Sequence, residues 1–439
     1  QLEGGDILAD AIVGRLSFSS LTEFQTILNK IFQYEMTPYM TETDWYNEIL
    51  LVGDPSHSGS STQTCNKSIK EAMQNYTDEY NYNEEYSGGY STFINNNIQS
   101  GVSFFNYRGY IGMSGWSPGG YTNGPMMPNA VIITCATGSF TGSTSTTEAF
   151  LREGTPTVPK GAVTAIGTAT ASTHTMYNNC VSMGIFHGIF NEGIYNMGGA
   201  LVRGKLHLYD TYSVTTPSQT QNFSLWNNLM GDPGMEVWTG IPDYMIVEHD
   251  NNANEGSNYF SVNVTNSTGE PLPGAWVTLL GTEDESVFAT GYTDDAGQIV
   301  LELDPSYSDD TYLTVTAHDF VPYLTEFSVE NSNIFVNISD ITIDDDNGGD
   351  SSGNDDGVIN PGEEIELRVY LHNYGSTTAS GVSATISCTE DFVTISDASE
   401  SYGDIAGGEM GFSSDDFDIS IPADVLGGSE FMLEVTITD

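Results

Sequence analysis

The hydrophobic pattern changes its period near residue 240, and this change constrains the fold more than any other feature of the sequence. Before that point, short apolar runs without alternation are separated by segments with helical spacing. After residue 257, short runs alternate apolar and polar residues, with turn residues between them. Continuous apolar strands are buried on both faces, whereas alternating strands cover one face of a core. We therefore expect an α/β domain followed by all-β modules.

The α/β domain is expected over residues 1–241, as a parallel sheet with helices on both faces. Helical spacing is clearest in 21–35, 67–76, 92–101, 147–154 and 181–195. The expected strands are 11–18, 47–53, 102–107, 129–135 and 161–169. The segment 201–210 reads as alternating. Both chain ends are expected to be cut from a longer precursor.

Two immunoglobulin-like β-sandwich modules are expected to follow, at 257–340 and 341–439. The segment 242–257 is read as the first boundary, and the Asp- and Gly-rich stretch 344–357 marks the second. Residues 269–303 resemble carboxypeptidase-regulatory-like and related modules of secreted bacterial proteins. That resemblance implies a spacer or adhesion module without chemistry of its own.

Charge separates the two parts as sharply as the hydrophobic pattern does. The chain has a formal net charge of −50. Residues 1–239 hold 20 acidic and nine basic residues, whereas residues 240–439 hold 40 acidic residues and one basic residue, Arg368. A chain without a cationic surface has no means of neutralising phosphates, so nucleic acid is excluded as a partner. No apolar run reaches the length of a transmembrane helix, so membrane insertion is not expected.

Cys135 closes the buried run "AVIITC" and precedes the small-residue loop "ATGSFTGSTST". Ligands of open parallel sheets bind beyond the carboxyl ends of the strands, where a thiol is exposed and loop amides can bind an oxyanion. The alternative is a buried core cysteine. Periodicity alone favours that alternative.

Five segments of the first part resemble the gingipain family of secreted cysteine peptidases. They read, in order, "LEGGDILADAIVGRLSFSS", "SFFNYRGYIGMSGW", "AVIITCATGSF", "EAFLREGTPTVPKGAVTAIGTATAST" and "LWNNLMGDPGMEVW". The resemblance implies the catalytic subdomain of a caspase-like fold, with another subdomain before Gln1. It implies that Cys135 is the nucleophile, and that amides around Ala136 and Gly109 form the oxyanion hole. It further implies a protein or peptide substrate, and an extracellular location with association to a cell surface or matrix.

One position departs from the family pattern. The family histidine closes an "NYxGH" motif, and here the motif reads "NYRGY" with Tyr110 at that position. A phenol is a poor general base at neutral pH. His174, in the loop after 161–169, and His57, in the loop after 47–53, both belong at the edge that carries Cys135. We expect a Cys135–His174 pair, with His57 as the second choice. If neither pairs with the thiol, the protein is an inactive homologue that serves as an extracellular scaffold, adhesin or polymer subunit.

The remaining cysteines have structural interpretations. Cys65 and Cys180 each precede an expected helix at the same sheet edge, so a disulfide between them is geometrically feasible and suits an oxidising exterior. Cys388 is read as a core thiol of a sandwich strand. His187 is read as a core residue of the expected helix 181–195.

The acidic stretch 344–364 resembles a calcium loop. An EF-hand-type alignment starting at Ser352 places oxygen-bearing side chains at the ligand positions and glycine at position 6. We expect one structural calcium ion here, because so many carboxylates repel one another without a cation. The candidate ligands are Asp344, Asp346, Asp350, Asn354, Asp356, Asn360 and Glu363. The alternative is a solvated acidic linker.

Overall fold

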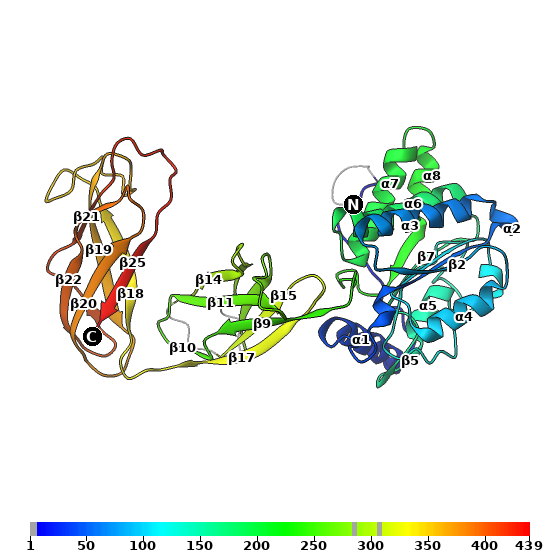
Figure 1. Ribbon diagram of the computed structural model, residues 1–439, viewed down its shortest axis with the longest axis horizontal. Helices are drawn as coiled ribbons and strands as arrows, with labels where there is room; N and C mark the ends of the chain where they lie inside the picture. The colour runs from blue at the N-terminus through cyan, green and yellow to red at the C-terminus, as the bar shows by residue number, and fades with distance from the viewer. Residues whose placement is uncertain (1–6, 283–287, 305–309) are drawn as a thin grey trace. The chain divides into compact units, whose positions relative to one another are not determined.

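The computed structural model describes residues 7–282, 288–304 and 310–439 (Figure 1). The chain forms two compact units. The first runs to Tyr244 and includes 317–322, and the second comprises 245–316 and 323–439. The first six residues of the gingipain-like region, and parts of the segment 269–303, lie outside the described residues.

The first unit is built on a six-stranded sheet in the order β2-β1-β3-β4-β7-β8. The first five strands in that order are parallel, and β8 is antiparallel to β7. The strands are β1 (Glu48–Gly53), β2 (Asn81–Glu85), β3 (Phe104–Arg108), β4 (Asn129–Val131), β7 (Thr164–Thr168) and β8 (Asn227–Met230). The prediction of a parallel α/β sheet is confirmed.

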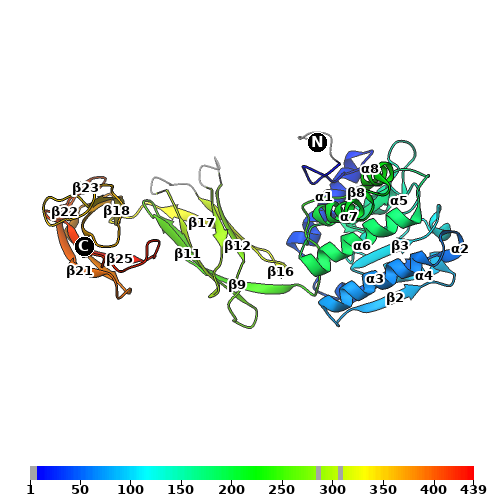
Figure 2. The same ribbon diagram turned by 90° about the horizontal axis from the view of Figure 1, so that it is seen from above.

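Helices cover both faces of this sheet (Figures 1 and 2). One face carries α3 (Ser61–Tyr76), α6 (Thr175–Glu192), α7 (Met197–Tyr212) and α8 (Pro217–Trp226). The other carries α1 (Leu21–Met36), α4 (Tyr90–Ser100) and α5 (Thr146–Arg152). The short elements are α2 (Pro55–Ser58), the 3-10 turns η1 (Asp44–Asn47) and η2 (Met113–Gly115), and the ribbon β5 (Gly154–Thr155) and β6 (Val158–Pro159).

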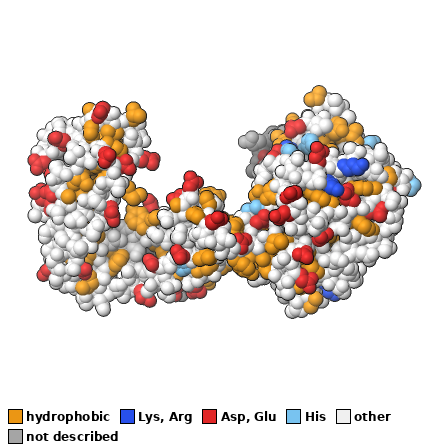
Figure 3. Space-filling view, viewed as in Figure 1, with side chains coloured by type: hydrophobic (Ala, Val, Ile, Leu, Met, Phe, Trp, Pro, Cys, Tyr) orange, Lys and Arg blue, Asp and Glu red, His pale blue; other side chains and the backbone are white. Residues whose placement is uncertain are grey.

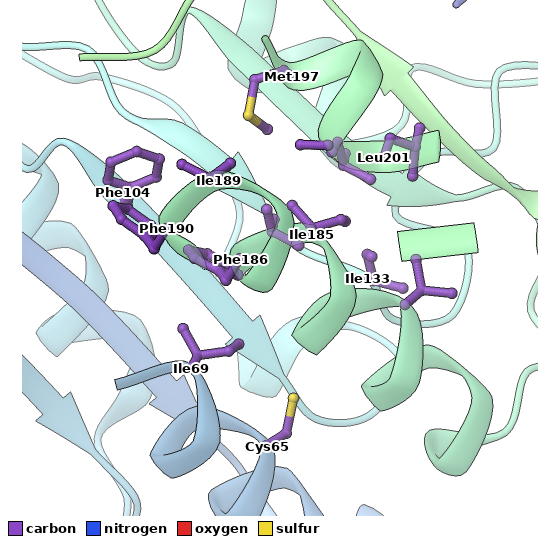
Figure 4. Close-up of a cluster of buried hydrophobic side chains, with 14 of the residues drawn as sticks. Cys65, Ile69, Phe104, Ile133, Ile185, Phe186, Ile189, Phe190, Met197 and Leu201 are labelled. Carbon is purple, nitrogen blue, oxygen red and sulfur yellow. The ribbon is translucent and has the colours of Figure 1, made fainter. Parts of the chain in front are cut away.

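Strand β3 shows why the apolar runs do not alternate. Phe104 points into the core under α3 and α6, and Phe105 points into the core over α4. Both faces bury side chains, so both sets of positions are apolar. Figure 4 shows the first of these cores, where Ile69 of α3 and Ile185 and Phe186 of α6 pack together.

Two element predictions in this unit are wrong. Residues 11–18 form no strand beyond an isolated bridge from Arg15 to Met230, and their apolar side chains Ile12 and Val13 are exposed. Residues 201–210 lie in helix α7, whose buried residues Leu201, Gly204 and Leu208 have helical spacing. Gly204 is needed there because a Cβ would lie 2.6 Å from the Val181 carbonyl oxygen.

The second unit contains two β-sandwiches, as predicted. The first has one sheet of β10 (Asn252–Asn254), β17 (Tyr323–Glu330), β15 (Thr311–Thr316), β12 (Trp276–Gly281) and β13 (Phe288–Tyr292). Its other sheet has β14 (Gln298–Glu302), β11 (Tyr259–Asn266), β9 (Asp243–His249) and β16 (Phe320–Val321). The first two residues of β9 and all of β16 belong to the first unit.

The second sandwich follows from residue 336. One sheet has β18 (Val336–Asp344), β19 (Glu364–Asn373), β24 (Phe417–Ser420), β21 (Thr394–Asp397) and β23 (Met410–Gly411). The other has β22 (Ser399–Ile405), β20 (Ala379–Cys388) and β25 (Leu433–Thr438). In Figure 3 acidic side chains lie over both units, whereas the visible Lys and Arg side chains lie on the α/β unit.

The segment 242–257, read from sequence as a boundary, holds strands β9 and β10. Strand β9 pairs with β11 and β16. The sequence analysis did not predict this strand, because the residues around it are polar and acidic. Among the described residues, no helix is long and apolar enough to cross a bilayer.

Lys30 of α1 is buried in the α/β unit with its ammonium group facing backbone carbonyls. Its Nζ donates to the carbonyl oxygens of Leu151 at 2.8 Å and Glu153 at 3.4 Å. Burial lowers the pKa of Lys30 to about 7, although the charge of Glu153 opposes this shift. The folded state therefore binds this proton less well than the unfolded state, in which a lysine has a pKa near ~10.4.

We predict that Lys30→Met removes a pH-dependent part of the stability. Between about pH 7 and ~10 the unfolded wild type holds a proton that the folded state lacks, so stability rises with pH in this window. In urea unfolding followed by tryptophan fluorescence, wild type should gain stability from pH 7 to pH 9 relative to Lys30→Met. The exposed Lys67→Met is the control and should behave as wild type. An equal pH dependence in wild type and Lys30→Met would contradict the assignment.

Candidate active site

The loops after β1, β3, β4 and β7 border one cleft of about 550 Å³ at the carboxyl edge of the sheet. The predicted site residues Cys135 and His174 both line it, and so does His57. The other polar side chains of its lining are Ser58, Ser61, Arg108, Tyr110, Thr134, Thr173, Thr175, Asn178, Asn179 and Tyr212.

Cys135 lies in the turn beyond β4, and its thiol is half-buried. Its Sγ lies 3.0 Å from Thr173 Oγ1. The turn folds back onto the end of β7, where Gly138 N donates to Thr168 O at 3.0 Å. A Cβ at Gly138 would lie 2.8 Å from the Gly167 carbonyl carbon, so only glycine permits this approach. The thiol therefore faces the cleft, and the core-cysteine alternative is wrong.

The two proposed oxyanion amides follow β4 and β3. The Ala136 amide itself donates to the Thr170 carbonyl oxygen at 2.8 Å, so that one N–H is already engaged in the conformation described. The Gly109 carbonyl accepts from Ser58 Oγ at 2.8 Å and from Thr134 Oγ1 at 3.0 Å, which orients the Gly109–Tyr110 peptide. A side chain at Gly109 would meet the Tyr107 hydroxyl at 2.4 Å.

His174 lies in the cleft as the N-cap of α6, and its ring is already engaged. Its Nδ1 accepts from the Met176 amide at 3.1 Å. In the neutral ring this bond places the proton on Nε2, which can then donate but not accept. Among the described residues no hydrogen bond joins His174 to Cys135. Cys135 and His174 therefore line the same cleft, but they are not hydrogen-bonded to each other in the described structure.

His57 and Tyr110 lie side by side. The two ring centroids are 5.0 Å apart and the ring planes are tilted by 45°, so an imidazole lies beside the residue that occupies the family histidine position. His57 is exposed on the short helix α2. Asp54 caps α2 by accepting from the Ser56 amide at 2.9 Å. Burial raises the pKa of Asp54, but hydrogen bonds from Ser114 and Ser56 and the charge of His57 outweigh this and hold it below its usual value.

The sequence reading did not single out Arg108, the last residue of β3. Its side chain is 1% exposed, and its Nε donates to Asn179 Oδ1 at 2.8 Å. The sequence could have pointed to this residue, because a charged side chain in a strand buried on both faces is rare unless it is paired or binds a ligand.

Cys65 and Cys180 are free thiols, so the predicted disulfide is wrong. Both lie inside their helices rather than before them. The Cys65 thiol donates to the Asn179 carbonyl oxygen at 3.8 Å, and the Cys180 thiol donates to Thr211 Oγ1 at 3.6 Å. Figure 4 shows Cys65 at the border of the apolar core. The prediction that His187 is a core residue is also wrong, because its side chain is exposed and its Nε2 lies 3.4 Å from Glu192 Oε1.

The acidic loop is closed by its own hydrogen bonds. Asp345, which was not among the predicted ligands, accepts from the Gly357 amide at 3.0 Å and the Asp356 amide at 3.1 Å. Glu363 accepts from the Asn360 amide at 2.8 Å. Within the described ranges, no three acidic, histidine or cysteine side chains are arranged to hold a metal ion. Calcium binding by this loop stays a prediction.

The layered sheet and the thiol at its carboxyl edge define a cysteine peptidase-like fold. The chain belongs to peptidase family C25, whose model matches residues 1–238. This confirms the resemblance to gingipains. No curated protein matches the sequence.

Solved structures that share the fold include the following three. The Arg-specific cysteine proteinase gingipain R is 22% identical, with a TM-score of 0.65 over 75% of this chain and 78% of that chain. A complex of the RgpB pro- and mature domains of Porphyromonas gingivalis is 20% identical, with a TM-score of 0.64 over 74% and 78%. A structure described as a protease is 18% identical, with a TM-score of 0.60 over 74% and 76%.

We predict that iodoacetamide distinguishes the cysteines of the native protein. Burial raises the pKa of Cys65 to about 11 and also raises the pKa of Cys180, so neither presents a thiolate at pH 8. Mass spectrometry should find native labelling on Cys135 and Cys388, with Cys65 and Cys180 labelled only in urea. A Cys65–Cys180 linked peptide in a non-reduced digest would contradict the free thiols.

Proposed function

We propose that the α/β unit is a cysteine endopeptidase that hydrolyses peptide bonds with Cys135 as its nucleophile. The observation that carries this proposal is the half-buried Cys135 thiol in a cleft bordered by two imidazoles, within a family C25 fold. A thiol, an imidazole and a positioned backbone amide are the groups that acyl transfer needs.

In this mechanism an imidazole accepts the proton of Cys135, and the thiolate sulfur bonds to the scissile carbonyl carbon. The carbonyl oxygen takes the negative charge, and in this proposal the Gly109 N–H at the cleft edge donates a hydrogen bond to it. The carbon–nitrogen bond then breaks, and the imidazolium gives its proton to the leaving amine. Water, deprotonated by the same imidazole, releases the acyl group from sulfur.

We assign the base to His57 in preference to His174, on contacts. His174 Nδ1 caps α6, and accepting a proton on Nε2 would require the other tautomer and the loss of that cap. His57 has no such engagement among the described residues. The charge of His57 is among the causes that lower the pKa of Asp54, so a carboxylate lies near this imidazole. The tilted Tyr110 ring, which occupies the family histidine position, packs beside the His57 ring.

A non-catalytic scaffold is the second candidate. The observation that favours it is Tyr110 itself, since a phenol at the histidine position cannot replace a base at neutral pH. In that case the cleft would bind peptides without cleaving them.

We place the protein outside the cell or at its surface, where it would meet protein substrates, in keeping with its family and its adhesion-type β-sandwiches. The arginine specificity of gingipain R belongs to that protein. The cleft described here contains a buried guanidinium, which would repel an arginine side chain of a substrate.

Substitutions in the cleft test the peptidase proposal. Cys135→Ala should abolish hydrolysis of a casein or peptide-library substrate. His57→Ala should lower kcat by about 10²–10⁴-fold, as expected for loss of a general base. His174→Ala should cost less, and Cys388→Ala is the control with unchanged rate. A larger loss for His174→Ala would move the base to His174. The absence of hydrolysis by wild type would favour the scaffold.

We retain calcium as a proposal for the stretch 344–364, on its sequence alone. An ion bound by Asp356, Asn360 and Glu363 would have to replace the hydrogen bonds that these side chains now accept or donate. Thermal unfolding in calcium and in chelator tests it. A higher midpoint with calcium, lost in Glu363→Gln, would support the site, and equal midpoints would contradict it.

A further inference from the structure

Within the part of the chain that the structure describes, Arg108 is a buried cation without a carboxylate partner. It is 1% exposed, and its Nη1 has no hydrogen-bond acceptor among the described residues. Burial lowers its pKa, and the charges of Cys65, Tyr107 and Cys135 and a side-chain hydrogen bond with Cys65 oppose this shift. A buried charge is costly to leave unpaired, so proteins pair such groups or use them to bind an oppositely charged ligand.

The guanidinium borders the cleft that holds Cys135. The lining of this cleft contains Arg108, His57 and His174 but no Asp or Glu, although the chain has 60 acidic residues. Asn178 lines the same cleft, is 1% exposed, and has a buried Oδ1 without a partner. Arg108 Nη1 and Asn178 Oδ1 are thus both buried at this cleft, and neither forms a hydrogen bond with the described residues.

We propose that this cleft binds acidic peptides, and that Arg108 forms an ion pair with the side-chain carboxylate of an Asp or Glu close to the scissile bond. The proposal deepens the peptidase function and rests on it for the identity of the ligand. A guanidinium presents donors in a planar fork that matches a carboxylate, and the pair is strengthened by the absence of water around a buried group. The fixed bond from Nε to Asn179 orients the fork.

Asn179→Asp is the variant that isolates the charge. It places a carboxylate 2.8 Å from Arg108 Nε, so the guanidinium acquires an internal partner and remains in place. The substitution is nearly isosteric, and its local cost is the bond from Asn179 Nδ2 to the Ser61 carbonyl oxygen. Asn96→Asp, on the exposed face of α4, adds the same charge elsewhere and is the matched control.

The test is a calorimetric titration of the full chain carrying Cys135→Ala, which removes hydrolysis. The probes are acetylated, amidated peptides that differ only in Glu or Gln at one position, scanned along the peptide. We expect one Glu position to bind about tenfold or more tightly than its Gln counterpart, as for a charge-assisted hydrogen bond. Adding Asn179→Asp or Arg108→Met should abolish the preference, while Asn96→Asp should retain it. Unchanged thermal unfolding identifies folded variants.

Equal binding of the Glu and Gln peptides at every position, or binding of neither, would overturn the acidic-peptide site. Alkylation is measured in proteins that keep Cys135. If the Glu and Gln peptides bind equally and Asn179→Asp raises the pH at which Cys135 is alkylated, Arg108 stabilises the Cys135 thiolate. That result would also overturn the acidic-peptide site. Hydrolysis by wild type is scored separately. A Glu preference without hydrolysis would refute the peptidase and leave the site, whereas hydrolysis without a preference would refute the site alone.

Discussion

The parallel hydrogen bonding of β2, β1, β3, β4 and β7 is the constraint on which the site depends. Parallel strands end at one edge, so the loops that follow them converge however far apart they are in sequence. His57, Arg108, Cys135 and His174 follow or close four different strands and line one cleft for this reason. The antiparallel β8 ends the series and contributes no loop to the cleft lining.

The sequence was sufficient for features that depend on burial. Strands such as β3 are apolar on both faces, and the position of Cys135 after β4 placed the thiol at the functional edge. Prediction from sequence failed for elements whose type depends on an exposed sheet edge or on close packing between helices. Strand β2 is the polar run Asn81–Glu85 at a sheet edge, and α7 is fixed by the close approach of Gly204 to α6. Neither the edge position of β2 nor the contact between α7 and α6 can be derived from the pattern of residues alone.

The contacts within the site were beyond sequence reasoning for a different reason. The bond that caps α6 with His174 is local, but its consequence for the imidazole proton depends on which nitrogen accepts it. The ring contact between His57 and Tyr110 joins two loops from separate strands. Arg108 was visible as a charge in a buried strand, whereas its lack of a carboxylate partner emerges only from the packed structure.

The central claim is that Cys135 is a working nucleophile in this cleft. A crystal structure of the wild-type protein with a peptide aldehyde tests it directly, because an active thiol adds reversibly to the aldehyde carbon. We predict a covalent bond from Cys135 Sγ to that carbon, with the peptide in the cleft between His57 and His174. A cleft without the aldehyde, with Cys135 still a free thiol beside Thr173, would contradict the claim.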